Sequence, residues 1–247
     1  MIKIFVDFDG TITRQDVGDA MFEHFGGIRC ADIVKDYYRE KISAVECLEQ
    51  ECLACGEVDK VDLDAFVDDQ EIDSTFVDFV KFCNSSGLDC TIVSDGMSYY
   101  IERILHNNRL ADVQFFSNAL DLVQIDSTSK VRFKPSFPYT DEDCDRCACC
   151  KRNHMLRLSS DDDTIVYIGE GYSDRCPARY ADVVFAKGDL LKYCQQENIS
   201  FFEYQTFADV VARLENILST KRPNGEIVGL WKRRRAELAR REIFMGG

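Results

Sequence analysis

Four short apolar runs divide this chain of 247 residues, and each run ends in a loop of polar or glycine residues. β-Branched and aromatic side chains are frequent in the runs, which is typical of strands buried on both faces of a parallel sheet. Helical patterns lie between the runs. The alternation predicts an α/β fold with an open sheet of parallel strands. The four runs are residues 2–6, 90–93, 164–168 and 181–186.

The first two runs are more than 70 residues apart, too many for a single crossover. Between Asp16 and Asp73, apolar residues recur at spacings of three and four, which indicates helices. We therefore predict a small helical cap inserted after the first strand. Apolar and polar side chains alternate in residues 115–138 as they do in β-strands, and this pattern predicts a hairpin. The expected division is a core of residues 1–14 and 76–220, a cap of residues 15–75 and a basic C-terminal extension of residues 221–247.

Charge is unevenly distributed along the chain. The net charge is −14, yet the last 27 residues carry eight Lys/Arg against three Asp/Glu. The chain before this basic tail is strongly acidic. This argues against nucleic acid as the main partner, because phosphate backbones bind positive surfaces. The basic tail from Lys232 to Arg241 is expected to be a solvated helix or a helix docked on the acidic body, with nucleic-acid or membrane contact as the alternative.

The sequence offers no run of the roughly 18–20 apolar residues that a membrane helix needs. Its first residues reach Asp7 too soon for a secretory signal. We expect no membrane association and a cytoplasmic location.

Two carboxylates, Asp7 and Asp9, follow the first apolar run directly. One can attack phosphorus while the other donates a proton to the leaving oxygen and later activates water. Gly10 lets the backbone pass close to a phosphate, and Thr11 can hold the turn. The alternative reading is a plain Asp-Gly turn.

Polar residues also follow the other runs. Ser94, with the backbone N–H groups of Asp95 and Gly96, can bind a phosphoryl oxygen. Lys151 begins a helical stretch and can offset the charge of the nucleophile and the phosphate, with Lys130 and Lys134 as rivals.

A pair of acidic residues, Glu170 and Asp174, follows the third run. Carboxylates gathered near Asp7 would repel one another unless a cation lay among them. Magnesium, which prefers oxygen ligands, is the expected ion.

These motifs together resemble the haloacid dehalogenase superfamily, in its phosphoserine-phosphatase-like subgroup. They occur in the order typical of that superfamily and extend from residue 7 to residue 174. The segments 149–151 and 167–184 resemble the methionine-salvage phosphatases that act on 2-hydroxy-3-keto-5-methylthiopentenyl-1-phosphate. The resemblance implies a Rossmann-like core and a magnesium-dependent phosphatase acting on a small phosphorylated molecule. In it, Asp7 is the nucleophile, Asp9 the acid/base, and Ser94 and Lys151 are phosphate ligands, while Asp7, the Asp9 carbonyl and the acidic pair hold magnesium.

The sequence departs from the superfamily pattern at Glu170, where an aspartate is usual. Its extra methylene disturbs an octahedral magnesium site, so we expect Asp174 to be the direct ligand, Glu170 to act through water, and manganese to substitute. A catalytically weak relative that binds a phosphorylated ligand is the alternative function.

Substrate recognition is expected in the cap. Asp16 stands where phosphoserine phosphatases have a Glu that holds the substrate ammonium, and the position of their cap arginine falls near Glu49. An acidic cap pocket would suit phosphoethanolamine or phosphocholine, while Asp16 as a helix cap is the alternative.

The chain holds 12 cysteines, four of them clustered within seven residues. The cluster could bind a structural zinc ion, remain as unpaired thiols, or form disulfides. Its members are Cys144, Cys147, Cys149 and Cys150.

Overall fold

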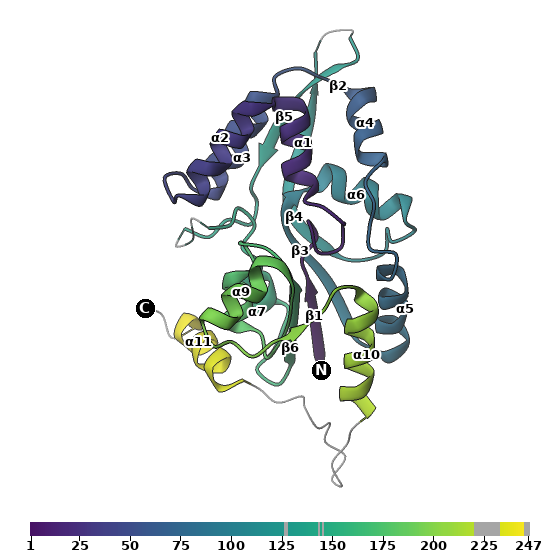
Figure 1. The fold of residues 1–247 in the computed structure, drawn as a ribbon, viewed down its shortest axis with the longest axis vertical. Coiled ribbons are helices and arrows are strands. Elements are labelled where there is room, and N and C mark those ends of the chain that lie inside the picture. The colour runs from purple at the N-terminus through teal and green to yellow at the C-terminus, as the bar shows by residue number, and fades with distance from the viewer. Residues whose placement is uncertain (126–127, 143, 145, 220–232, 245–247) are drawn as a thin grey trace. The chain divides into compact units, whose positions relative to one another are not determined.

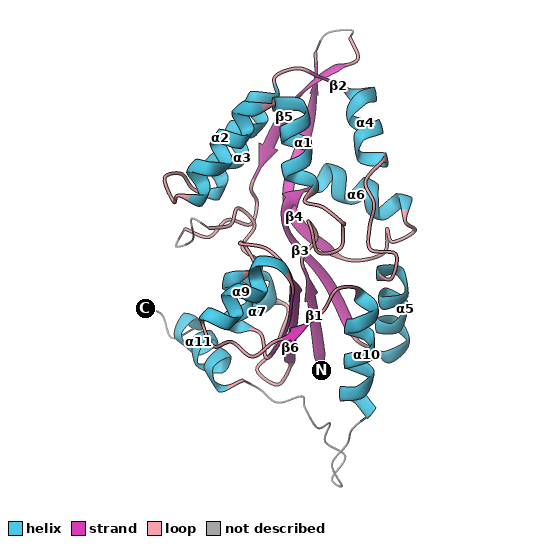
Figure 2. Ribbon diagram, in the orientation of Figure 1, coloured by secondary structure: helices cyan, strands magenta, loops and turns pink. Residues whose placement is uncertain are grey.

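The computed structural model describes the chain apart from residues 126–127, 143, 145, 220–232 and 245–247. The described residues form two compact units, and each contains both helices and strands (Figures 1 and 2). The first unit comprises Met1–Asp7, Ile72–Ile92 and Lys151–Gly247; the second comprises Phe8–Glu71 and Val93–Cys150.

A parallel sheet lies at the centre of the first unit. Strand β1 runs between β3 and β6, with Val6 opposite Ile92 on one side and Ile168 on the other. Strand β7 extends the sheet beside β6, and β8 follows beside β7. The predicted parallel strands are confirmed. Their bounds are β1 (Ile2–Val6), β3 (Asp89–Met97, continuing into the second unit), β6 (Thr164–Gly169), β7 (Val183–Ala186) and β8 (Phe202–Glu203).

Helices flank this sheet, with α5 and α10 on one side of β1 and α7 and α9 on the other (Figure 1). Phe207 joins α10 to α5, because its ring centroid lies 4.7 Å from that of Phe76 and 5.0 Å from that of Phe79. Burial of these three rings fixes both helices against the sheet. The helices of this unit are α5 (Phe76–Ser86), α7 (Lys151–Arg157), α8 (Arg175–Tyr180), α9 (Gly188–Gln196), α10 (Phe207–Ser219) and α11 (Arg234–Phe244).

The C-terminal helix α11 docks on α8. Arg233 donates to the carbonyls of Ala178 and Arg179, and Arg240 donates to that of Tyr180 at 2.5 Å. These carbonyls form the last turn of α8, where cations are favoured. The described part of the tail is therefore a docked helix, as expected; residues 221–232 of the basic extension lie outside the described residues.

The second unit contains an antiparallel ribbon, in which β4 and β5 form the predicted hairpin and β2 pairs with β5. Five helices accompany it. Residues 16–73 fold as predicted into helices, with the two-residue strand β2 as an addition. Ser43 and Glu46 form a reciprocal capping box that starts α3. The elements are α1 (Val17–Gly26), α2 (Ile28–Tyr38), α3 (Ala44–Cys55), β2 (Val58–Asp59), α4 (Lys60–Asp68), α6 (Ser98–Asn107), β4 (Phe115–Gln124) and β5 (Lys130–Ser136).

Within the described ranges, every helix is too short or too polar to pass through a lipid bilayer.

Candidate active site

The side chain of Asp7 lies at the carboxyl end of β1. Its backbone N–H donates to the carbonyl of Ile168 at 2.9 Å, so the sheet ladder fixes the residue in place. Its carboxylate is buried, with only 5% of the residue exposed. Ligands of open α/β sheets bind beyond this end of the strands.

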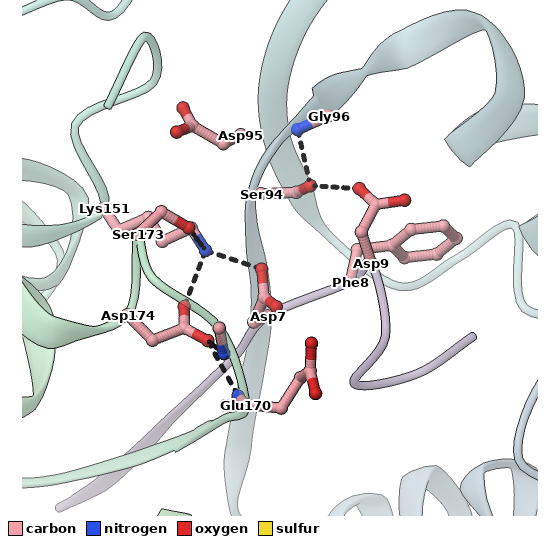
Figure 3. Close-up of polar contacts among 12 residues, drawn as sticks. Asp7, Phe8, Asp9, Ser94, Asp95, Gly96, Lys151, Glu170, Ser173 and Asp174 are labelled. Carbon is pink, nitrogen blue, oxygen red and sulfur yellow. Dashed lines mark hydrogen bonds and ion pairs between the residues drawn. The ribbon is translucent and has the colours of Figure 1, made fainter. Parts of the chain in front are cut away.

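Lys151, the first residue of α7, is the counter-ion of Asp7. Its Nζ lies 2.6 Å from Asp7 Oδ1, 2.7 Å from Asp174 Oδ1 and 2.9 Å from Ser173 Oγ (Figure 3). The lysine side chain is 1% exposed, and a buried cation needs such partners. The rival lysines lie on β5, where Lys130 pairs with Glu57 at 3.9 Å.

Asp174 has four hydrogen-bond donors on its two oxygens. Oδ1 accepts from Lys151 and from the Tyr167 hydroxyl at 2.5 Å, and Oδ2 accepts at 2.8 Å from the backbone N–H groups of Glu170 and Gly171. A carboxylate offers about four lone-pair sites, so all of them are taken. Asp174 is therefore a residue that orders the loop and orients Lys151. Gly169 permits this approach, because a Cβ there would lie 2.5 Å from Asp174 Oδ2.

Glu170 carries the other carboxylate of this loop. Its Oε2 lies beside Gly188, where an added Cβ would be only 2.7 Å away. The charges of Glu170, Asp73 and Asp7 act on Lys187, and they partly offset the burial that lowers the pKa of this lysine. Two lysines of the first unit, Lys151 and Lys187, therefore interact electrostatically with its acidic residues.

Asp9 belongs to a second group of contacts, formed within the second unit. Its Oδ2 accepts from the Tyr100 hydroxyl at 2.9 Å and from Ser94 Oγ at 3.3 Å, and its Oδ1 accepts from the backbone N–H of Val17. The N–H of Gly96 donates to Ser94 Oγ at 2.9 Å (Figure 3). Ser94 and Asp9, two of the predicted site residues, are thereby in contact.

Tyr100 is a site residue that the sequence analysis missed. It is fully buried on α6, and burial together with the charge of Asp9 raises its pKa well above the usual value. Its hydroxyl therefore stays protonated and donates to Asp9. Gly96 makes room for this pair, because a Cβ there would lie 2.3 Å from Asp9 Oδ2. An aromatic residue at a helical spacing is typical of a core, and nothing else in its pattern distinguishes it.

Thr11 and Asp95, two residues predicted to bind phosphate, lie in the second unit. Thr11 is fully buried, while the hydroxyl that crosses the turn is that of Thr13, which accepts from Gly10 N at 3.1 Å. Asp95 Oδ1 accepts from the backbone N–H groups of Ala148 and Cys149 at 2.8 and 2.7 Å. Asp95 thus ties the Ser94 loop to the segment that precedes Lys151.

In the helices formed by residues 16–73, Asp16 is the N-cap of α1 and accepts from Asp19 N at 2.8 Å, and Glu49 is exposed on α3. The sequence analysis overlooked Glu51. This residue is 2% exposed, and its Oε1 has no hydrogen-bond partner among the described residues. Burial raises the pKa of Glu51 from 4.5 to about 8, and the negative charges of Asp19 and Asp16 add to the effect.

The four clustered cysteines lie in the segment that precedes Lys151. Cys144 and Cys147 approach each other, with 3.5 Å between their Sγ atoms, and no disulfide joins any of the 12 cysteines. Across the described ranges, no three His, Cys, Asp or Glu side chains are arranged to hold a metal ion. The structure therefore gives no support for a structural zinc ion at Cys144, Cys147, Cys149 and Cys150. The same result applies to the acidic residues expected to hold magnesium.

Solved structures with the same fold include phosphatases and another hydrolase. A HAD family hydrolase from Salmonella enterica serovar Typhi superposes with a TM-score of 0.66 at 16% identity, covering 85% of this chain and 69% of that one. A phosphoserine phosphatase with a phospho-aspartyl intermediate analogue gives 0.64 at 16% identity, covering 86% and 98%. The chain therefore shares its fold with these hydrolases.

Proteins related in sequence identify the family of this chain. A 2-hydroxy-3-keto-5-methylthiopentenyl-1-phosphate phosphatase of Bacillus cytotoxicus is 30% identical over 223 residues, covering 89% of this chain and 99% of the relative. The enzyme of the same name from Bacillus thuringiensis is 26% identical over 227 residues, with the same coverage. The sequence model of the Putative Phosphatase family matches residues 2–210. The chain belongs to this family and is a phosphomonoester hydrolase.

Proposed function

We propose that the chain hydrolyses a small phosphomonoester through a phosphoryl group carried on Asp7. The observation that supports this most directly is the buried pair of Asp7 and Lys151 at the end of β1, with 2.6 Å between Asp7 Oδ1 and Nζ. A carboxylate oxygen without a proton is a nucleophile, and a neighbouring ammonium keeps it ionised.

In the first step, Asp7 forms a bond to phosphorus and the bond to the leaving oxygen breaks, while Asp9 donates a proton to that oxygen. In the second step, Asp9 takes a proton from water, which attacks phosphorus and releases inorganic phosphate from Asp7. One residue separates the two aspartates, so their Cα atoms lie within about 7 Å. Tyr100 orients the Asp9 carboxylate, and Ser94 and Lys151 bind the phosphoryl oxygens.

A magnesium ion is part of this proposal. The carboxylates of Asp7 and Glu170 and the backbone carbonyl of Asp9 are oxygen donors, which suit a hard cation. Asp174 is left out, because protein donors occupy both of its oxygens. This assignment reverses the expected order of Glu170 and Asp174. When bound, magnesium would neutralise charge on the transferring phosphoryl group, and manganese could replace it.

The leading substrate is 2-hydroxy-3-keto-5-methylthiopentenyl-1-phosphate, after which the Bacillus relatives are named. Their near-complete coverage supports the transfer of this activity.

A second candidate substrate carries a cation, as phosphoethanolamine and phosphocholine do. The supporting observation is Glu51, a buried carboxyl group with an unpartnered oxygen under the negative charges of Asp19 and Asp16. The negative charges of Asp9 and Asp16 both raise the pKa of Tyr100, so both carboxylates lie close enough to act on this tyrosine. An ammonium group would be attracted by the negative charges of Asp16 and Asp19 and would donate a hydrogen bond to Glu51.

Steady-state assays with magnesium on p-nitrophenyl phosphate, the methionine-salvage phosphate, phosphoethanolamine and phosphocholine test the proposal. We expect turnover that EDTA and Asp7→Asn abolish. Asp9→Asn should slow ester substrates by about 10²–10⁴-fold, and p-nitrophenyl phosphate less, because its leaving group needs no proton. Full activity of Asp7→Asn would refute the mechanism. The absence of turnover on every phosphate would favour the phospho-ligand-binding alternative.

A further inference from the structure

Two cysteines of the cluster lie close enough to react with each other. The Sγ atoms of Cys144 and Cys147 are 3.5 Å apart, and a disulfide needs a separation of about 2.05 Å. Cys144 is half-buried and Cys147 is 4% exposed, so an oxidant reaches Cys144 first. Both stand on irregular backbone, which can move the remaining 1.5 Å or so more easily than a helix or strand can.

We propose that Cys144 and Cys147 form a redox-reactive pair that hydrogen peroxide converts to a disulfide. The Cys144 thiolate attacks one peroxide oxygen, which gives a sulfenic acid and releases the other oxygen as water. The Cys147 sulfur then attacks the sulfenic sulfur, and the second oxygen leaves as water. Two thiols are oxidised to one disulfide, and one peroxide is reduced to two waters.

Contacts on both sides of the pair connect it to the phosphate-binding loop. Between the two cysteines, the Arg146 carbonyl accepts from the Tyr37 hydroxyl at 2.7 Å. Directly after Cys147, the N–H groups of Ala148 and Cys149 donate to Asp95, the neighbour of Ser94. A disulfide that displaces Cys147 therefore strains the hydrogen bonds of Asp95.

The same segment leads to the lysine of the other unit. The N–H of Cys150 donates to the Tyr139 carbonyl at 2.8 Å, and Lys151 follows by one peptide bond. If the proposed phosphatase function holds, oxidation of the pair lowers turnover by disturbing Ser94 and Lys151 together.

Another candidate pair, Cys83 and Cys90, also interacts through its side chains. Cys83 lies within α5 and Cys90 within β3, so both backbones are fixed by regular hydrogen bonds. Their sulfurs are thus less able to reach disulfide geometry than those of Cys144 and Cys147.

Trypsin offers a direct test, because Arg146 lies between the two cysteines. The full chain is treated with peroxide, alkylated and digested without reductant, then analysed by mass spectrometry. We expect peptides 133–146 and 147–151 to stay linked and to separate on addition of dithiothreitol. Cys147→Ser should abolish the link and Cys176→Ser should preserve it. A link that persists in Cys147→Ser, or none in the wild type, would overturn the proposal.

Turnover of p-nitrophenyl phosphate gives a second readout. Peroxide should lower it several-fold in the wild type, with recovery in dithiothreitol, and should leave Cys144→Ser unaffected. A linked peptide with unchanged turnover would overturn the connection through Asp95. The peptide link is measured without turnover, so it decides the disulfide even if the proposed phosphatase function fails.

Discussion

Single carboxyl groups differ sharply in what surrounds them. Asp174 is saturated with donors, Asp9 accepts from Tyr100, Ser94 and a backbone N–H, and Glu51 keeps an oxygen without a partner. The sequence analysis named the first two as site residues, but it expected Asp174 to be a direct metal ligand and did not foresee its four donors. The role depends on which donors fold around each oxygen, and those donors come from distant parts of the chain.

The contrast between Glu170 and Asp174 leads to a prediction about metal binding. Glu170→Gln should raise the magnesium concentration needed for half-maximal turnover by about tenfold or more, because it removes a charged ligand. Asp174→Asn should mainly lower the melting temperature, since an amide cannot accept four hydrogen bonds. Magnesium titrations and thermal melts of both variants measure this. A larger magnesium shift in Asp174→Asn would restore that residue as the direct ligand.

Glu51 leads to a prediction about pH. Its pKa of about 8 exceeds the ordinary 4.5, so the folded protein keeps a proton that the unfolded chain has lost. Wild-type stability therefore falls as pH rises from 4.5 to 8. Glu51→Gln removes this loss and should stabilise the protein at pH 8 by about 2–4 kcal/mol, at roughly 1.4 kcal/mol per pKa unit. The gain should vanish near pH 4.5.

Chemical denaturation at both pH values gives the comparison. Glu49→Gln, on the exposed face of the same helix, is the matched control and should follow the wild type. If Glu51→Gln and the wild type lose stability in parallel, Glu51 is not held neutral.

Helix α11 shows how an element remote from β1 in sequence supports the first unit. Asp182, immediately before β7, is fully buried and accepts from Ile165 N, Arg233 N and Arg240 Nη2. The basic tail was predicted from its charge, but its partner was not. The surface that binds the tail consists of backbone carbonyls and one aspartate. Such a surface cannot be recognised from a sequence pattern.

Arg240→Ala should therefore lower the free energy of unfolding by about 2–4 kcal/mol, because it leaves a buried carboxylate short of a cation. Arg241→Ala is the control, since Arg241 is exposed and forms a surface ion pair with Glu237 one turn away. That variant should stay within about 0.5 kcal/mol of the wild type. Equal losses in both variants, measured by urea denaturation, would contradict a specific role for the docked helix.

At the scale of the whole molecule, much of the fold could be predicted, because a buried parallel strand can be recognised from its own short apolar run. Apolar runs that end in polar residues predicted β1, β3, β6 and β7 correctly, and Asp7 follows β1 as expected. Ser94 lies within β3 and not at its end, because β3 continues to Met97. The hairpin was predicted by alternation. The division into core, cap and extension stays a prediction. Tyr100 and Glu51 were missed because each looks like an ordinary helical residue until distant segments surround it.

The lysine shared by Asp7 and Asp174 implies a trade-off between stability and activity. One ammonium faces two carboxylates, so these three groups together carry one net negative charge, which the charge of Lys187 offsets in part. Asp7→Asn should relieve it, raising the melting temperature by a few degrees while eliminating turnover. A lower melting temperature would show that the wild-type arrangement is already balanced. On this account Asp7 lowers the stability of the folded protein, and it is retained because catalysis requires it.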